Sequence, residues 1–325
     1  MRHQSRKRRR GPGRFIIGAL VIVVVAALGV GVYLRSSSAD SSGPLPVQLP
    51  AATGAYLGVY TQGVPDSYSS VAAFNNTIKA KPDVVMYYSG WFVPFPTKFA
   101  TTVANNGAVP LVQMDPDNIS VSQIASGRYD GYLSAYAEAV RAYKHPVVLS
   151  FGHEMNGTWY SWGYRHTPHA VFVAAWRHIV TLFRTLGAHN VTWLWTVNII
   201  NHAHGGSSIP NPAQWWPGSS YVNWVGIDGY YLKPTWKFAP LFGPTITAVK
   251  HLTLDPILVA ETGAVPAAGQ PAKITDLFSG IHRYGLLGFV WFNSTNSSGQ
   301  QFGLSSPQAV TAFRKGASTY SRPGG

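Results

Sequence analysis

Eight short apolar runs, each typical of a buried β-strand, recur between residues 55 and 320 and constrain the fold more than any other feature. Most are separated by amphipathic stretches in which apolar residues recur at spacings of three and four, as in helices. The predicted strands are Tyr56–Tyr60, Asp83–Tyr88, Ala108–Met114, Pro146–Phe151, Val191–Val197, Asn223–Tyr230, Pro256–Ala260 and Leu286–Phe292. Eight strands alternating with helices over this length predict an α/β fold, a (β/α)8 TIM barrel.

Helices are predicted in most of the connections, and the Ile199–Tyr221 connection shows no helical pattern. The predicted helices are Ser69–Lys79, Lys98–Asn105, Tyr129–Tyr143, Pro168–Leu186, Thr245–His251, Ile274–Tyr284 and Pro307–Ala317. An open doubly wound sheet is the alternative fold. It is disfavoured because no Gly-x-Gly-x-x-Gly turn follows an early strand.

The N-terminal part of the chain is predicted to be a membrane anchor. Residues 1–14 form a basic cytoplasmic tail, residues 15–34 are uncharged and apolar, and residues 35–54 are rich in Ser and Pro and resemble a flexible tether. A 20-residue apolar helix spans about 30 Å, the thickness of a bilayer core. Because basic residues stay in the cytoplasm, the 55–320 domain is expected outside the cell. A cleaved signal peptide, which would make the protein secreted, is the alternative.

The charge distribution disfavours nucleic-acid binding. The net charge of +13 includes eight basic residues within residues 1–35, which leaves 17 basic and 12 acidic residues in the remainder of the 325-residue chain. A mildly basic domain without a second basic cluster is not typical of a nucleic-acid-binding protein. No cysteine is present, which excludes disulfides, thiol catalysis and Cys-ligated metals.

Polar and aromatic residues follow the predicted strands at one end, where a barrel of this class carries its active site. After the second to eighth strands these residues are Trp91, Asp115, His153, Glu154, Asn198, Asn201, Asp228, Tyr230, Tyr231, Glu261, Trp291 and Asn293.

The segment Val147–Gly163 combines a buried strand with a carboxylate and three large aromatic residues, Trp159, Tyr160 and Trp162. Aromatic faces can stack on a pyranose ring, and a carboxylic acid in apolar surroundings stays protonated near neutral pH. The alternative is that these aromatic residues only fill the core.

Two of the three glutamates, Glu154 and Glu261, end the fourth and seventh strands, whereas Glu138 lies in a predicted helix. Two carboxyl groups about 5–5.5 Å apart across a barrel mouth would perform retaining glycoside hydrolysis, one as nucleophile and the other as acid/base. We expect Glu261 to be ionised among hydrogen-bond donors, and Glu154 to be less solvated with a raised pKa. Burial of each glutamate in an ion pair with Lys or Arg is the alternative.

No metal or cofactor is predicted. The metallopeptidase pattern needs a second His four residues after His153, and that position is Gly157. His202 and His204 lie in a glycine-flanked loop, which indicates solvated side chains more than a metal site.

The segment His153–Gly163, His-Glu-Met-Asn-Gly-x-Trp-Tyr-x-Trp-Gly, resembles the acid/base motif of glycoside hydrolase family 26, the β-mannanase family of clan A. Three further segments resemble its sixth, seventh and eighth strands in order, namely Val225–Tyr230, Leu258–Gly263 and Phe289–Asn293. The resemblance covers roughly residues 55–318.

This resemblance implies Glu154 as acid/base and Glu261 as nucleophile, with Tyr230 donating a hydrogen bond to the nucleophile. It also implies a substrate-binding role for His153, Trp159, Asp228 and Trp291, to which the barrel-end pattern adds Trp91 and Trp162.

The expected function is retaining, endo-acting hydrolysis of a β-linked polysaccharide by a monomer, with β-1,4-mannan first and mixed-linkage β-glucan or β-xylan next. The chain departs from the family at Ser150, where Arg is common. A non-catalytic or differently specific polysaccharide-binding barrel at the cell surface is the alternative function.

Overall fold

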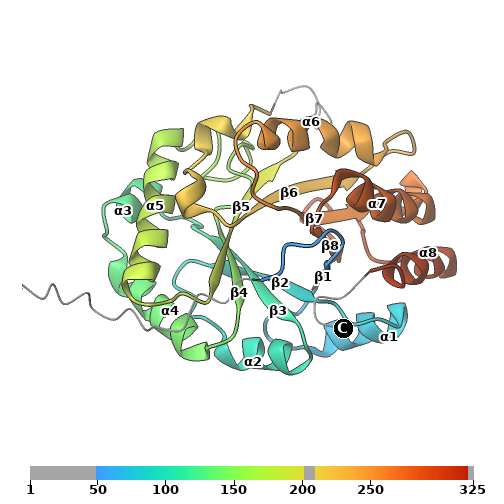
Figure 1. Ribbon diagram of the computed structural model, residues 1–325, viewed down its shortest axis with the longest axis horizontal. Helices are drawn as coiled ribbons and strands as arrows, with labels where there is room; N and C mark the ends of the chain where they lie inside the picture. Colours follow the sequence, from blue (N-terminus) through green and yellow to red (C-terminus); the bar gives the residue numbers. More distant parts are fainter. Residues whose placement is uncertain (1–48, 201–208, 321–325) are drawn as a thin grey trace, which may run out of the picture. The chain divides into compact units, whose positions relative to one another are not determined.

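The computed structural model describes residues 49–200 and 209–320, and its central feature is a closed barrel of eight parallel strands in the order β1 to β8. Strands β1 and β8 pair in parallel and close the barrel. Figure 1 shows the strands in the middle of the domain with the helices around them. The predicted (β/α)8 barrel is therefore confirmed.

Each predicted strand corresponds to an observed strand, with ends that differ by a few residues. The strands are β1 Tyr56–Thr61, β2 Val84–Gly90, β3 Val109–Asp115, β4 Val147–Phe151, β5 Val191–Asn198, β6 Trp224–Tyr231, β7 Ile257–Ala264 and β8 Gly288–Asn293. The helices are α1 Ser69–Ile78, α2 Thr97–Asn105, α3 Val121–Ala125, α4 Asp130–Tyr143, α5 His169–Thr185, α6 Phe238–Lys250, α7 Gln270–Tyr284 and α8 Pro307–Ala317. Short 3-10 turns are η1 Pro212–Trp215, η2 Ser219–Tyr221 and η3 Pro266–Ala268.

The largest difference from the predicted helices is at α6, which begins at Phe238 and not at Thr245. Pro240, Gly243 and Pro244 lie in its first half, and proline and glycine are read as helix breakers. Packing overrides this local preference because Phe238, Leu241 and Phe242 are buried. The helix α3 and the 3-10 turns η1 and η2 were not predicted, since each is too short to show a periodic pattern.

Alternation along the strands divides the core into two layers, as expected for a barrel. The side chains of one layer fill the barrel interior, among them Tyr56, Val84, Met86, Leu111, Val148, Leu194, Trp224, Leu258, Ala260 and Val290. The larger second layer lies between the barrel and the helices. Strand β8 shows the division, because Val290 belongs to the inner layer and Trp291 to the outer one.

A β-bulge in β7 changes which side chains point into the barrel. Leu258 pairs with Gly226 and Glu261 pairs with Asp228, so β7 has one more residue than β6 in this interval. Leu258 and Ala260 are both in the inner layer, and simple alternation would turn Glu261 outward toward the helices. The extra residue turns Glu261 inward, which is a known use of bulges next to active sites.

The predicted tail and anchor, residues 1–34, and most of the predicted tether lie outside the described residues. The barrel belongs to a compact unit that spans Gly43–Gly325. In the described part of the chain, no helix is both long and apolar enough to cross a bilayer.

Candidate active site

A cavity of about 400 Å³ lies at the C-terminal end of the barrel, and Glu154 and Glu261 both line it. The other lining residues come from the ends of five strands and from the loops that follow β4, β6 and β8: Tyr60, Tyr88, Trp159, Tyr160, Asn198, Tyr230, Leu232, Phe292, Thr295, Asn296, Ser297 and Gln300. The two glutamates that end predicted strands therefore share one cavity.

A sharp turn after β4 places Glu154 in this cavity. Gly152 has φ 55° and Glu154 has φ 54°, both in the left-handed region. A β-carbon at Gly152 would lie 2.9 Å from Phe172 and 3.1 Å from Trp162. The backbone N–H of Glu154 donates to the Thr196 carbonyl oxygen at 3.0 Å, which fixes the turn against β5. A non-glycine residue in this conformation is strained, and such strain is found mainly at functional sites.

The carboxylate of Glu154 accepts one hydrogen bond at each oxygen. The Asn198 side-chain amide donates to Oε1, and the Trp159 indole donates to Oε2 at 2.6 Å. Asn198 is held in turn by Asn156, whose side chain donates to the Asn198 carbonyl oxygen and accepts from its N–H, both at 2.8 Å. Glu154 is thus oriented from both sides, with only 7% of its surface exposed.

Two tyrosine hydroxyls hold the carboxylate of Glu261. Tyr88 donates to Oε2 and Tyr230 donates to Oε1. Glu261 is also 7% exposed, and this burial raises its pKa to about 8. The phenol donors act in the opposite direction, because hydrogen bonds to a carboxylate favour the ionised form. The structure therefore has the expected donors, but the expectation that Glu154 is the less solvated of the two is wrong.

Asp228 lies in the barrel register between Glu261 and Asn198, the residue that donates to Glu154. Asn198 pairs with Asp228, and Asp228 pairs with Glu261, so the Cα atoms of Asn198 and Glu261 are two strand spacings apart, about 10 Å. Asp228 is fully buried, and neither of its carboxyl oxygens has a hydrogen-bond partner among the described residues. Burial, followed by the charge of Glu154, raises the pKa of Asp228 well above its usual range. Its surroundings therefore favour the protonated form of Asp228.

His153 forms a buried ion pair beside Glu154. Its Nδ1 lies 2.8 Å from Asp115 Oδ1, and its Nε2 lies 3.1 Å from the Tyr160 hydroxyl. Burial opposes the charge on His153, but the Asp115 carboxylate outweighs it and raises the pKa of His153 to about 9. Trp162 stacks on Tyr160 with ring centres 4.3 Å apart, and its indole donates to the His153 carbonyl oxygen at 2.8 Å.

Among residues 49–200 and 209–320, neither Glu154 nor Glu261 forms an ion pair with a basic side chain. His153 forms an ion pair with Asp115, and His178 forms one with Asp130. The alternative that Glu154 or Glu261 is buried with a Lys or Arg partner finds no support in this part of the chain.

The predicted site residues divide into three groups. Glu154, Glu261, Trp159 and Tyr230 line the cavity, whereas His153, Asp115 and Asp228 are buried next to it. Trp162 is also buried and supports Tyr160 instead of facing the cavity. Asn201, His202 and His204 lie outside the described residues.

Two predicted sugar-binding tryptophans do not line the cavity. Trp291 is fully buried and packs on Phe313 of α8, with ring centres 5.6 Å apart. The neighbouring residue Phe292 lines the cavity instead. The prediction that Trp291 faces the cavity is therefore wrong, because Trp291 lies on the outer face of β8. Trp91 is 8% exposed and packs against Tyr132 and Phe151. Tyr231 also points outward, where its hydroxyl lies 3.4 Å from Asp276.

Several residues that line the cavity were not predicted from the sequence. Tyr60 and Tyr88 lie inside predicted strands at inward positions, and counting alternate residues would have found both. The sequence of the polar loop after β8 has no pattern that indicates a binding site. There Asn296 accepts hydrogen bonds from the N–H groups of Ser298 and Gln300, which makes the loop a fixed hairpin.

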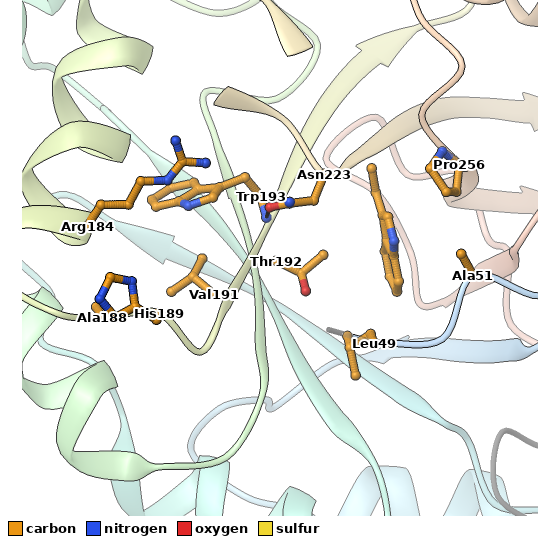
Figure 2. Close-up of a pocket in the computed structure, with 11 residues that line it drawn as sticks. Leu49, Ala51, Arg184, Ala188, His189, Val191, Thr192, Trp193, Asn223 and Pro256 are labelled. Carbon is orange, nitrogen blue, oxygen red and sulfur yellow. Dashed lines mark hydrogen bonds between the residues drawn. The ribbon is translucent and has the colours of Figure 1, made fainter. Parts of the chain in front are cut away.

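A second cavity of about 390 Å³ lies at the opposite end of the barrel, next to the starts of β5 and β6. Figure 2 shows Arg184, His189, Trp193 and Asn223 around it. No acidic residue of the described chain lines this cavity, so it lacks the pair of carboxyl groups that glycoside hydrolysis needs. In the same described residues, no cluster of His, Asp or Glu is arranged to hold a metal ion.

Comparisons with known proteins agree with this geometry. Over 279 residues the chain is 30% identical to endoglucanase H of Acetivibrio thermocellus, and the match covers 81% of this chain but only 30% of that protein. Among solved structures, the chain is similar to a mannanase of Bacillus subtilis, with 15% sequence identity and a TM-score of 0.59. This match covers 80% of this chain and 85% of the mannanase chain. A β-mannanase of Bacteroides ovatus has 18% identity, a TM-score of 0.59 and coverage of 82% and 86%. At these identities the structural likeness shows the fold alone.

The sequence model of glycosyl hydrolase family 26 matches residues 48–270, more than half of the chain. This stretch includes seven strands of the barrel and both cavity glutamates. The chain thus belongs to glycosyl hydrolase family 26.

Proposed function

We propose that the protein is an endo-acting glycosidase that cleaves β-linked polysaccharide with retention of configuration, and that β-1,4-mannan is its substrate. The observation that carries this proposal is a pair of buried glutamates on one cavity, each held by hydrogen-bond donors and neither in an ion pair with a described residue. Retaining glycosidases need such a pair, with one carboxylate as nucleophile and one carboxylic acid as proton donor.

Glu261 is the nucleophile in this proposal. Tyr88 and Tyr230 fix its two oxygens and leave the carboxylate facing the cavity. The ionised carboxylate attacks the anomeric carbon, the bond to the leaving oxygen breaks, and a glycosyl ester forms on Glu261. Water then cleaves this ester, and the second inversion restores the original configuration.

Glu154 is the acid/base. In the first step it protonates the leaving oxygen, and in the second it takes a proton from the attacking water. Asn198 and Trp159 hold the Glu154 carboxyl group in one orientation, which keeps it directed at the same oxygen position in both steps. The exposed face of Trp159, 44% accessible, provides a stacking surface for a sugar beside the cleaved bond.

The substrate assignment rests on the relatives and on the shape of the site. The similar structures include mannanases of Bacillus subtilis and Bacteroides ovatus, whereas the curated relative is an endoglucanase. Mixed-linkage β-glucan is therefore the second candidate substrate, and β-xylan the third. The aromatic side chains that line the cavity provide stacking surfaces for an uncharged polysaccharide.

Replacement of Glu261 by Ala tests the proposal. Release of reducing sugar from mannan, mixed-linkage glucan and xylan is measured for the full-length protein and the variant. We expect the variant to lose activity by a factor on the order of 10³ or more, because no other carboxylate can form the ester. The matched control is Glu138→Ala, at an exposed position of α4, and it should retain activity. Unchanged sugar release by the Glu261 variant would refute the assignment.

A polysaccharide-binding protein without turnover is the second candidate. Burial raises the pKa of Glu261 to about 8, and a protonated carboxyl group is a poor nucleophile at neutral pH. Calorimetric titration with oligosaccharides, combined with an overnight product assay, distinguishes the two candidates. Binding without product at any pH would favour this second function.

We also propose that the barrel acts outside the cell on a membrane tether and that it is a monomer. The basic and apolar sequence of residues 1–34 supports the tether and the location outside the cell. The full-length chain should float with membranes, and deletion of residues 1–42 should release the barrel as a monomer in gel filtration.

A further inference from the structure

We infer that Phe92 forms a distal sugar-binding subsite for the polysaccharide, outside the cavity that holds the two glutamates. Phe92 follows β2 directly, is 57% exposed and has φ 67°. The inference rests on the proposed function, because it assigns a second contact to the same polymer.

The backbone at Phe92 points to a function for its ring. A left-handed conformation is easily adopted by glycine, whereas a bulky residue there is a true outlier. The exposed ring gains little from burial, so neither the turn nor the core requires phenylalanine at this position. A strained backbone that holds an exposed aromatic side chain is a feature that structures keep mainly at binding sites.

The ring of Phe92 is held by other aromatic rings. Its centre lies 5.6 Å from that of Tyr129 and 5.5 Å from that of Tyr132, both edge-on. The Tyr132 hydroxyl donates to the Val93 carbonyl oxygen at 3.0 Å, which fixes the loop itself. Trp91 packs beneath, with its ring centre 5.1 Å from that of Tyr132. An aromatic platform fixed in this way binds a ligand with little loss of side-chain freedom.

The position of Phe92 links it to the catalytic cavity. Tyr88, which donates to Glu261, lies four residues earlier in the same chain segment, and four residues span at most about 14 Å. A polysaccharide in the cavity can therefore reach Phe92 within a few sugar units. Val93 and Pro94 are also exposed and uncharged, so the surface suits the C–H face of a neutral sugar.

Exposed apolar side chains are concentrated at this end of the barrel. Among the described residues, the exposed large hydrophobic side chains are Phe92, Val93, Trp159 and Leu254. Trp159 lines the cavity, and only Leu254, just before β7, lies at the opposite end. Leu254 is 95% exposed and provides a matched control.

The experiment measures polysaccharide binding without turnover. The full-length Glu261→Gln variant is used as background, and affinity electrophoresis in gels with galactomannan or mixed-linkage β-glucan gives the dissociation constant. Phe92→Gly and Phe92→Ala should each weaken polymer binding by about two- to tenfold, the strength of one aromatic contact. Phe92→Trp should preserve binding, and Leu254→Ala should not change it.

The glycine and alanine variants separate binding from folding. Both remove the ring, but glycine also relieves the left-handed strain, so Phe92→Gly should unfold at a higher temperature than Phe92→Ala. Equal weakening of binding by both variants supports the subsite. Binding that follows the unfolding temperature, or that both variants leave unchanged, overturns it. A change of oligomeric state in the Phe92 variants also overturns it, because the ring would then serve contacts between copies of the chain. This assay needs no hydrolysis, so its failure is distinct from a failure of the proposed reaction.

Discussion

At the scale of single residues, Glu154 and Glu261 are equally buried but have different hydrogen-bond partners. An amide and an indole hold Glu154, whereas two phenol hydroxyls hold Glu261. Hydrogen bonds to a carboxylate favour its ionised form, which the nucleophile needs before it can attack. The two tyrosines therefore offset part of the burial that raises the pKa of Glu261.

Removal of one of these hydroxyls, by Tyr88→Phe, should move the pH dependence of hydrolysis. For the unchanged protein, kcat/KM should rise with pH through a limb between about 4.3, the ordinary value for Glu, and about 8. The variant should shift this limb upward by about one to two units, because a hydrogen bond to a charged group contributes about 1.5–3 kcal/mol. Tyr143→Phe, which removes a buried hydroxyl that donates to Ala100, is the control. A limb that stays in place would show that Glu261 does not set it.

The pair of Asp115 and His153 should contribute to stability in a pH-dependent way. The pKa of His153 is raised to about 9 in the folded protein, so its stabilisation is complete below the unfolded value of about 6.5 and is lost as pH rises through about 9. Asp115→Asn should lower the free energy of unfolding by about 2 kcal/mol near pH 6, and by much less near pH 9.5. Urea denaturation at both pH values measures this difference. A difference that grows with pH would contradict the charged pair.

At the scale of secondary structure, the sequence predicted the strands well and the direction of some side chains poorly. Apolar runs gave all eight strands, since buried parallel strands are apolar on both faces. The same property hides which face points inward, which explains the error at Trp291. The bulge in β7 that turns Glu261 inward is defined by the pairing of β7 with β6. The sequence of a single strand does not determine how that strand pairs with its neighbour.

Gly226, in β6 opposite this bulge, should not accept a side chain. A β-carbon there would lie 2.5 Å from Thr196 Oγ1 and 3.0 Å from Ala260 Cβ. Gly226→Ala should lower the free energy of unfolding by about 1–3 kcal/mol, the usual effect of overpacking. It should also reduce kcat, because a shift of Ala260 would displace the next residue, Glu261. The control is Gly131→Ala in α4, where nothing lies within 4 Å of the added carbon. Thermal unfolding and initial rates of both variants check this, and equal stabilities would contradict the packing argument.

At the scale of the whole molecule, the barrel brings together side chains that are far apart in sequence. The contact between Tyr88 and Glu261 joins residues 173 positions apart. The closed strand order predicts that both lie at one end, because strand ends of a parallel barrel share a rim. It does not predict that Tyr88 reaches the Glu261 carboxylate, since that depends on side-chain packing. Sequence therefore identified the two glutamates, and the structure added the donors that hold them.

The central claim, that Glu261 is the nucleophile of a retaining hydrolase with Glu154 as its acid/base, is tested most directly by trapping the glycosyl ester. The full-length protein is incubated with a 2-deoxy-2-fluoro-β-mannosyl fluoride, digested, and analysed by mass spectrometry. We predict one added sugar, located on Glu261, because the fluorine slows hydrolysis of the ester. A label on Glu154 or on any other residue, or an unlabelled protein that releases product of inverted configuration, would contradict the account.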